Sequence, residues 1–481
     1  GRVKERQGGD MESDVCWMGA LELLESYRGR ELSPVEVVRA VLERIDKMNP
    51  GINAMVTVSG ELAMEQARAA EKAYFQGKAR ALEGVPVTVK DLIFTRGIRT
   101  TWGSRMFEDY VPEMDAVLVE RLKEAGAVIL GKTNVPEFGL VAVTDNSVFG
   151  PSRNPFDRNK TAGGSSGGAA AGLAAGFGPL AVGNDGGGSI RIPSSLCGVF
   201  GLKPQFGRVP SWPHMVRGWE TMNCEGPMAR SVADAALMLD VMAGPDERDR
   251  FSLPAAEAGY LKSCGNGVRG LKVAYTCDLA SDAVDPEVAR ITRDAAFVFQ
   301  ELGCEVSEDD PGIPDMAQDL TVMVIEETYT AHEHHIEEAK EKMYPLYRPF
   351  IELAGAFSAA DVVRVHFHRE DLWDALWPFF EKYDLLVCPT TACAAFDLKE
   401  GGMMGPDTID GKEVTPASWI AFTFPFNFSG QPAASVPCGL TAEGLPVGLQ
   451  IVGRRYQEPM VLAAAAAFEE ARPWRDTYPR G

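Results

Sequence analysis

Apolar and polar residues follow two periods along the chain. Apolar residues at helical spacing predict helices over residues 33–48, 60–76, 115–124, 231–242, 285–302 and 458–471. Asn49-Pro50-Gly51 is expected to end the first helix. Short apolar runs predict strands over residues 85–89, 127–130, 271–275, 304–307, 384–388 and 446–452. Since helices and strands alternate, the pattern predicts an α/β domain with a parallel or mixed sheet.

Residues 314–380 form a second kind of region, helical throughout and rich in methionine, histidine and aromatic residues. Two interpretations stay open: a helical layer that caps the site, or an amphipathic layer that buries its aromatic side chains in the core. Residues 1–10 are polar and precede Met11, so we expect a processed leader or an expression remnant there. A single large domain is therefore expected over residues 11–477.

Composition excludes several kinds of partner. The 481 residues carry a formal net charge of −21, which argues against nucleic acid as a partner. No apolar run reaches the roughly 18 residues of a membrane span, so no membrane association is expected. The nine cysteines are dispersed and lack CxxC spacing, which argues against a disulfide framework or a zinc ribbon. We therefore expect a cytoplasmic protein.

Two glycine-rich loops that carry serines are the main candidates for chemistry. Gly163-Gly164-Ser165-Ser166-Gly167-Gly168 leads into a helical alanine-rich run, a short strand follows at 180–182, and the second loop, residues 183–189, ends at Ser189. Glycine permits positive φ and lets backbone N–H groups converge on an anion or oxyanion. A serine nucleophile also needs a base. None of the six histidines neighbours these loops, whereas Lys90 ends the apolar strand at 85–89, where burial would favour its neutral form.

These residues resemble the amidase signature family of Ser-Ser-Lys hydrolases. The resemblance rests on Lys90, the 163–168 loop and the run from Asp185 to Arg191. It extends over most of residues 30–475 through Gly84-Val85-Pro86, Gly131-Lys132-Thr133-Asn134, Gly201-Leu202-Lys203-Pro204, Cys224-Glu225-Gly226-Pro227-Met228-Ala229-Arg230 and Gly444-Leu445-Pro446-Val447-Gly448-Leu449-Gln450. It implies a mixed, twisted β-sheet surrounded by helices, and hydrolysis of small-molecule amides without metal or cofactor by a monomer or homodimer.

The resemblance also implies a role for each site residue. Ser189 is the expected nucleophile, Ser165 the bridging serine and Lys90 the terminal base, with a cis peptide before Ser165. The expected oxyanion hole consists of the backbone N–H groups of Gly186, Gly187 and Gly188, together with that of Ser189. Supporting roles fall to Asp185, Arg191 and Ser166, and substrate contacts to Gly139 and Leu140 in a loop that resembles a pocket-lining segment. Asn184 and Gly186 depart from the commoner family residues, and the small Gly186 favours a bulky acyl or aryl substrate.

Other functions stay open. A carbamate or ester hydrolase would use the same oxyanion hole. The glutamine-hydrolysing subunit of a tRNA amidotransferase resembles this family in length, although the bulky, aromatic segment 211–224 does not look like its usual counterpart there. The alternative of another class is a nucleotide-binding protein.

Three local patterns resemble sites of other kinds. Gly126 to Thr133 matches the phosphate-loop pattern, but the predicted helix precedes it and its own residues are strand-like. His332 and His335 have metal-ligand spacing on what we interpret as a solvated face. Cys224 is interpreted as a buried structural thiol.

Overall fold

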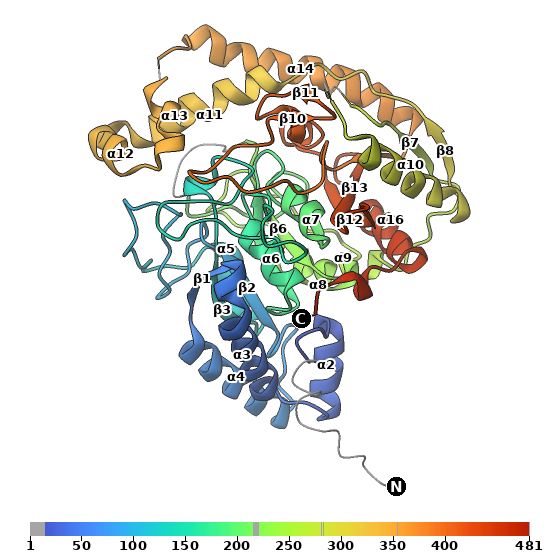
Figure 1. The fold of residues 1–481 in the computed structure, drawn as a ribbon. Helices are drawn as coiled ribbons and strands as arrows, with labels where there is room; N and C mark the ends of the chain where they lie inside the picture. Colours follow the sequence, from blue (N-terminus) through green and yellow to red (C-terminus); the bar gives the residue numbers. More distant parts are fainter. Residues whose placement is uncertain (1–14, 215–220, 280, 282, 354, 481) are drawn as a thin grey trace.

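An eleven-stranded mixed β-sheet runs through the molecule (Figure 1). The computed structural model describes residues 15–214, 221–279, 281, 283–353 and 355–480. The predicted leader at residues 1–10 lies outside this part. In spatial order the strands are β1 (Met55–Val58), β3 (Val128–Thr133), β2 (Pro86–Lys90), β4 (Leu180–Asp185), β6 (Cys224–Ala229), β5 (Phe200–Lys203), β12 (Ala433–Leu440), β13 (Pro446–Gly453), β9 (Leu385–Pro389), β7 (Lys272–Tyr275) and β8 (Glu305–Glu308).

Helices cover both faces of this sheet. They are α2 (Ala20–Gly29), α3 (Pro34–Ile52), α4 (Gly60–Phe75), α5 (Val117–Glu124), α6 (Gly167–Ala174), α7 (Arg191–Cys197), α8 (Val232–Met242), α9 (Tyr260–Ser263), α10 (Pro286–Glu301), α11 (Ala317–His332), α12 (Ile336–Lys342), α13 (Pro349–Glu352), α14 (Ala359–Lys382), α15 (Pro425–Phe428) and α16 (Glu458–Ala471). Single 3₁₀ turns are η1 (Glu137–Gly139), η2 (Glu333–His335), η3 (Pro345–Tyr347), η4 (Ser418–Ile420) and η5 (Arg475–Thr477). A two-stranded ribbon joins β10 (Thr408–Ile409) to β11 (Lys412–Glu413). The predicted mixed α/β architecture is therefore confirmed.

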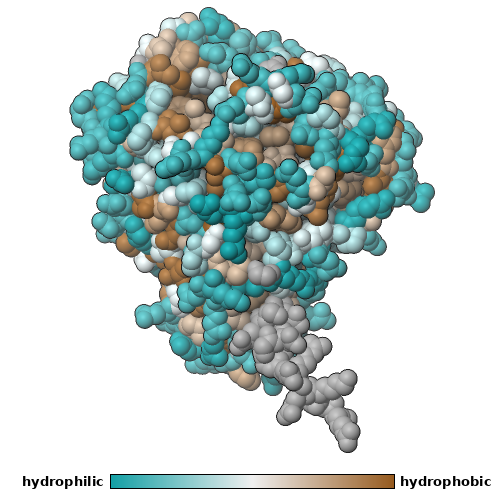
Figure 2. All heavy atoms as spheres, in the orientation of Figure 1, coloured by the Kyte–Doolittle hydropathy of each residue, from teal (hydrophilic) through white to brown (hydrophobic). Residues whose placement is uncertain are grey.

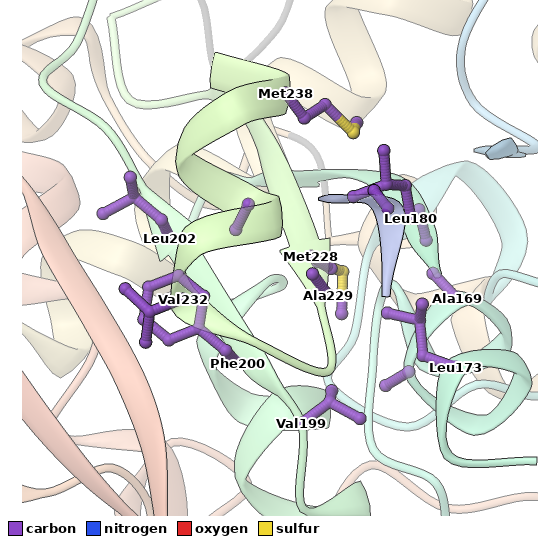
Figure 3. Packing of buried hydrophobic residues seen from close by; sticks show 14 of the residues in the cluster. Ala169, Leu173, Leu180, Val199, Phe200, Leu202, Met228, Ala229, Val232 and Met238 are labelled. Atoms are coloured by element: carbon purple, nitrogen blue, oxygen red, sulfur yellow. The ribbon is translucent and has the colours of Figure 1, made fainter. Parts of the chain in front are cut away.

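Apolar packing joins the helices to the middle of the sheet. The alanines of α6 and Leu173 belong to one apolar cluster with side chains of β4, β5, β6 and α8, and Figure 3 shows Ala169, Leu173, Leu180, Phe200 and Met228 within it. Helix α6 is buried along its whole length, so only glycine, alanine and leucine occupy it. The small residues let the helix lie close to the sheet, and this brings the serines before α6 next to the end of β2.

Helix α3 runs further than predicted, because Asn49-Pro50-Gly51 does not end it. Proline has a helical φ, and Pro50 lies inside the last turn of α3 although it cannot donate a backbone hydrogen bond there. Asn53 ends the helix in the left-handed conformation (φ 55°) and donates its backbone N–H to the Asn49 carbonyl. The predicted end was therefore wrong by about one turn.

Helices α11 to α14 form a layer at the end of the molecule opposite α2 to α4 (Figure 1). This layer contributes side chains both to the core and to the wall of a cavity. Leu372, Leu376 and Phe380 of α14 are buried in an apolar cluster, and α11 also lines a cavity described below. Figure 2 shows polar residues predominating at the periphery of one face, with apolar residues interspersed nearer its centre. Among the described residues, no helix combines the length and apolar character needed to cross a membrane.

Candidate active site

Lys90 lies at the centre of the site, where β2 ends between β3 and β4. Its side chain is fully buried. Its Nζ lies 2.7 Å from Oγ of Ser165 and 2.8 Å from Oγ of Ser166, and it donates to the carbonyl of Asn184 at 3.3 Å. Burial lowers the pKa of Lys90 well below its usual value, and the negative charges of Asp185 and Glu225 only partly oppose this effect. Burial therefore shifts Lys90 towards its neutral amine form.

The two serines beside Lys90 belong to the turn that opens α6. Ser166 immediately precedes the helix, and a cis peptide joins Gly164 to Ser165, as the resemblance implies. An added Cβ at Gly164 would lie 2.9 Å from backbone atoms of Ala142 and Val143, so this position has room only for glycine. The close packing presents both hydroxyl groups to the lysine.

Ser189 is brought to the same place by the loop between β4 and α7. Ser189 is partly exposed, whereas Ser165 is buried. The backbone N–H of Ser166 donates to the Ser189 carbonyl at 3.1 Å, and this bond fastens the two serine loops together. Ser165 and Ser189 line one cavity. Among the described residues, no hydrogen bond joins the two Oγ atoms, so the second link of the expected relay is not formed in this conformation.

A buried ion pair holds the Ser189 loop. Both carboxylate oxygens of Asp185 accept from Arg191, from Nε at 2.9 Å and from Nη2 at 2.8 Å, and neither side chain is exposed. Burial alone would raise the pKa of Asp185, but the charge and hydrogen bonds of Arg191 lower it below its usual value. The carboxylate also accepts from the backbone N–H groups of Gly188 (2.7 Å) and Ile190 (3.1 Å). Asp185 therefore fixes the backbone on both sides of Ser189.

The contacts of Gly188 require a correction to the expected oxyanion hole. Its N–H donates to Asp185 and is therefore not free to bind a developing oxyanion. Its φ of 128° and the 2.3 Å that would separate an added Cβ from Thr423 Oγ1 show why glycine stands there. Within the described part of the chain, the backbone N–H groups of Gly186, Gly187 and Ser189 have no hydrogen-bond acceptor, so three of the four expected donors remain available.

The loop at residues 138–141 lines the cavities beside Ser189, as the resemblance implies. Phe138 has a left-handed φ of 54° and Gly139 a φ of 74°. An added Cβ at Gly139 would lie 2.7 Å from Leu92 Cδ1 and 3.3 Å from Ser165 Oγ. Gly139 therefore leaves space directly beside Ser165 Oγ.

The lysine of the phosphate-loop pattern is buried away from this site. Gly126 follows α5, and the remaining residues form strand β3. Lys132 is buried and donates to the carbonyl of Ile93 and the hydroxyls of Thr95 and Thr100. No phosphate loop is present in this segment.

The thiol and imidazole candidates are placed differently. Cys224 is a buried thiol whose pKa burial raises to about 11. His332 ends α11 and is buried, so the solvated face expected for it was wrong, whereas His335 lies in the following 3₁₀ turn and is exposed. Within the described residues, no group of three histidine, cysteine or acidic side chains is arranged to hold a metal ion.

Several contributing residues were not singled out from the sequence. Asn427, on α15, donates to Asp185 and accepts from Arg191, while Gln450 accepts from Arg191 at 2.8 Å. They lie more than 230 positions from the loop, with no local signal that pairs them with it. Glu225 and Gln450 were quoted only as parts of motifs, although Glu225 lines the cavity and Gln450 contacts Arg191. The position of Glu225 directly before Gly226-Pro227 on a strand beside the serine loops could have indicated it.

Burial lowers the pKa of Lys90, and its Nζ contacts the hydroxyls of Ser165 and Ser166. The chain belongs to the amidase family, whose sequence model matches residues 36–462. It is a hydrolase that acts on amides, with the fold of the amidase signature enzymes.

Individual relatives are similar over nearly the whole chain. An acylamidase of Rhodococcus erythropolis is 40% identical over 474 residues, covering 97% of this chain and 98% of the relative. One subunit of the glutamyl-tRNA(Gln) amidotransferase of Geobacter sp. (strain M21) is 35% identical, covering 94% and 97%. Among solved structures, a bacterial aryl acylamidase of the amidase signature family superimposes with a TM-score of 0.91 at 35% identity, covering 97% and 98%.

Proposed function

We propose that this protein hydrolyses the carbon–nitrogen bond of a linear small-molecule amide through an acyl-enzyme on Ser189, with Ser165 as the bridging residue and Lys90 as the base. The observation that carries the proposal is the 2.7 Å contact between the buried Lys90 Nζ and Ser165 Oγ. Burial favours the neutral amine, and only the neutral amine has a lone pair that can accept a proton.

In the proposed first half-reaction, the Ser189 hydroxyl turns towards Ser165 and loses its proton to Ser165 Oγ as Ser165 passes its own proton to Lys90. The Ser189 oxygen attacks the amide carbonyl carbon and forms the carbon–oxygen bond. The tetrahedral intermediate collapses, and the leaving nitrogen takes the proton back along the same relay as the carbon–nitrogen bond breaks. Water then enters, gives a proton to the relay and attacks the acyl carbon through its oxygen. As the bond from this carbon to the Ser189 oxygen breaks, the relay returns the proton to Ser189 and the carboxylic acid is released.

The developing oxyanion would be bound by the free backbone N–H groups at Gly186, Gly187 and Ser189. Such donors contribute about 3 to 4 kcal/mol each to transition-state stabilisation in comparable sites. Asp185 and Arg191 act on this cradle indirectly, because they hold the backbone at Gly188 and Ile190. We infer that Ser166 and the Asn184 carbonyl orient Lys90, which both contact.

Two further properties belong to the proposal. The nine cysteines are all free thiols, which supports a reducing compartment such as the cytoplasm. We also infer that the protein acts as a monomer or homodimer without nucleic acid or a membrane as partner, and that residues 314–380 cover the site, because α11 lines the cavity beside Ser189.

The test is a panel of aliphatic amides, anilides, carbamates, esters and free glutamine, assayed with wild type and Ser189→Ala. We expect amide turnover in wild type, none above background in Ser189→Ala, and wild-type turnover in the control Ser307→Ala, an exposed serine on β8 at the sheet edge. Full amide turnover by Ser189→Ala would refute the proposal. Turnover of esters or carbamates alone would favour that alternative, and turnover of glutamine alone with co-purifying partner chains would favour the amidotransferase alternative.

A further inference from the structure

Two cavities of different character meet at Ser189. The first, called the polar cavity below, has mixed polar and aromatic walls that include Ser165, Asn184, Gly186 and Glu225. The second, called the apolar cavity below, has a volume of about 460 Å³ and is lined mainly by apolar residues, among them Ile192 of α7 and residues of α11 and α13. Ser189, Gly139 and Leu140 belong to both. A substrate whose carbonyl lies at Ser189 therefore has its two ends in different surroundings.

The proposed relay decides which end enters which cavity. The leaving nitrogen must receive its proton through Ser165, so it has to face that hydroxyl. Ser165 lines the polar cavity and is absent from the walls of the apolar one. The amine part of the substrate therefore points into the polar cavity. The acyl part takes the apolar one, where Leu320, Val324, Phe350 and Ile420 would surround it.

The polar cavity contains a carboxyl group with an oxygen to spare. Glu225 lies on β6 opposite Asn184 of β4, and its residue is only 7% exposed. Its Oε1 accepts from Ser211 Oγ at 2.8 Å and from Asn223 Nδ2 at 3.1 Å. Its Oε2 has no hydrogen-bond partner among the described residues. A buried oxygen without a hydrogen-bond partner lowers the stability of the fold. A ligand that donates a hydrogen bond to Oε2 would offset this loss.

Helix α11 faces the same cavity with two more polar atoms that lack partners. Thr328 Oγ1 and His332 Nε2 are buried and make no hydrogen bond within the described structure. Burial lowers the pKa of His332 to about 4, with His335 acting in the same direction, so the ring is neutral at neutral pH. Both groups can accept a hydrogen bond.

The charged side chains among the described residues that line this cavity are acidic, while Lys90 lies behind Ser165 and interacts with Glu225. Glu225 and Asp249 are its acidic residues, and the described residues that line it include neither lysine nor arginine. Asp249 uses its oxygens on the backbone N–H groups of Ser211 and Phe251, both at 2.9 Å, whereas Glu225 keeps one free. Burial raises the pKa of Glu225 to about 7, and a cation beside it would favour its ionised form. The cavity therefore suits a cation that donates hydrogen bonds.

We propose that the preferred substrates are amides of an apolar carboxylic acid whose leaving amine carries a second, protonated amino group, which Glu225 binds. Acylated diamines are the simplest members of this class. The inference rests on the proposed function, because it uses Ser165 to orient the substrate, and it adds the chemical class of the amine. A charge-assisted hydrogen bond to the buried carboxylate corresponds to a roughly 10- to 100-fold preference over an uncharged amine of the same length.

The experiment compares the hexanoyl amide of diaminobutane with that of pentylamine, in which a methyl group replaces the ammonium group. Both release hexanoate, which is quantified by chromatography at about pH 8, above the pKa of about 7 to which burial raises Glu225. Amides of diaminopropane and diaminopentane extend the series to other spacer lengths. We expect wild type to favour at least one diamine amide over the matched alkyl amide at least about tenfold in kcat/KM.

Two variants locate the effect. Glu225→Gln should reduce that preference to about threefold or less, chiefly through slower turnover of the diamine amide. The control Glu137→Gln changes another buried carboxyl group, which does not line either cavity, and should keep the wild-type preference. Circular dichroism and thermal unfolding verify that each variant is folded. If Glu225→Gln does not fold, the wild-type preference still tests the substrate class.

The outcomes separate this inference from the proposed function. Equal or better turnover of the alkyl amide by wild type, or an unchanged preference in folded Glu225→Gln, would overturn the inference and leave amide hydrolysis at Ser189 intact. Turnover of diamine and alkyl amides that persists in Ser189→Ala would instead overturn the proposed function. Loss of the preference in both Glu225→Gln and Glu137→Gln would show that Glu225 is not its specific source.

Discussion

The buried pair of Asp185 and Arg191 makes the sharpest prediction about how the fold supports the site. Replacing Asp185 by asparagine keeps the shape of the side chain and removes its charge. The carboxylate accepts from Arg191, from the backbone N–H groups of Gly188 and Ile190, and from Asn427. In the variant, one of the two oxygens becomes an NH₂ group that faces donors, and the fully buried guanidinium loses its counterion.

Breaking a buried ion pair by removing one partner typically costs about 3 to 5 kcal/mol, because an uncompensated charge remains inside the protein. The unfolding free energy of Asp185→Asn should fall by about that amount. Since folding lowers the pKa of Asp185, its contribution to the free energy of unfolding is fully present above the unfolded-state pKa of about 3.9. This contribution is lost as the pH falls through the folded-state pKa. The difference between wild type and variant should therefore be constant above about pH 5.

Activity should fall as well, because the same carboxylate fixes the loop that carries Ser189. A misplacement of about 1 Å can cost about 100-fold in rate, so we expect kcat to drop by that order with KM less affected. Urea unfolding followed by tryptophan fluorescence and steady-state kinetics measure the two effects.

The control is Asp397→Asn. It changes an aspartate that is 78% exposed and lies 3.2 Å from Lys160, and such a pair contributes only about 0 to 1 kcal/mol. If Asp185→Asn unfolded at the wild-type urea concentration and kept its kcat, the role given to the ion pair would be wrong.

Three further predictions concern the relay itself. Lys90→Met should lower amide hydrolysis by about 100- to 10,000-fold and ester hydrolysis less, because an amine leaving group needs the returned proton more than an alkoxide does. The difference is measured as kcat/KM for an amide and for its matched ester, and equal losses for the two substrates would contradict the prediction. Because only neutral Lys90 can accept a proton, wild-type kcat/KM for an uncharged amide should be low at pH values below the lowered pKa of Lys90 and should rise as the pH passes through it. A kcat/KM that stays constant down to pH values at which this buried amine must be protonated would oppose the assignment. Gly139→Ala should reduce kcat, because the new methyl group would lie 3.3 Å from Ser165 Oγ and the φ of 74° disfavours alanine; a fully active, folded variant would show that this space is not needed.

The sequence predicted the elements best where a local signal was strong. Helix α16 spans the predicted residues 458–471, and the alternation of helices and strands gave the α/β class. The end of α3 was misplaced because Pro50 is tolerated in a last helical turn closed by Asn53. Strand β12 was missed, and no local pattern indicates that it lies between β5 and β13, because strand order depends on long-range packing.

The candidate site divides in the same way. The contact between Lys90 and Ser165 follows from motif residues that the sequence already brings into focus. Gly188 shows the limit of that reasoning, because the sequence reveals three consecutive glycines but not which N–H group a carboxylate has already taken. The roles of Asn427, Gln450 and Glu225 depend on strands and helices from distant parts of the chain meeting at one end of the sheet, which a single sequence does not encode locally.

The most direct test of the central claim is to trap the acyl-enzyme. Wild type is mixed with the nitrophenyl ester of hexanoic acid, quenched in acid within the first turnover, digested and analysed by mass spectrometry. The mechanism predicts one hexanoyl group per chain, attached to Ser189 and absent from Ser189→Ala. Acylation at Cys224 or another residue, or complete turnover by wild type with no acylated serine at any quench time, would contradict it.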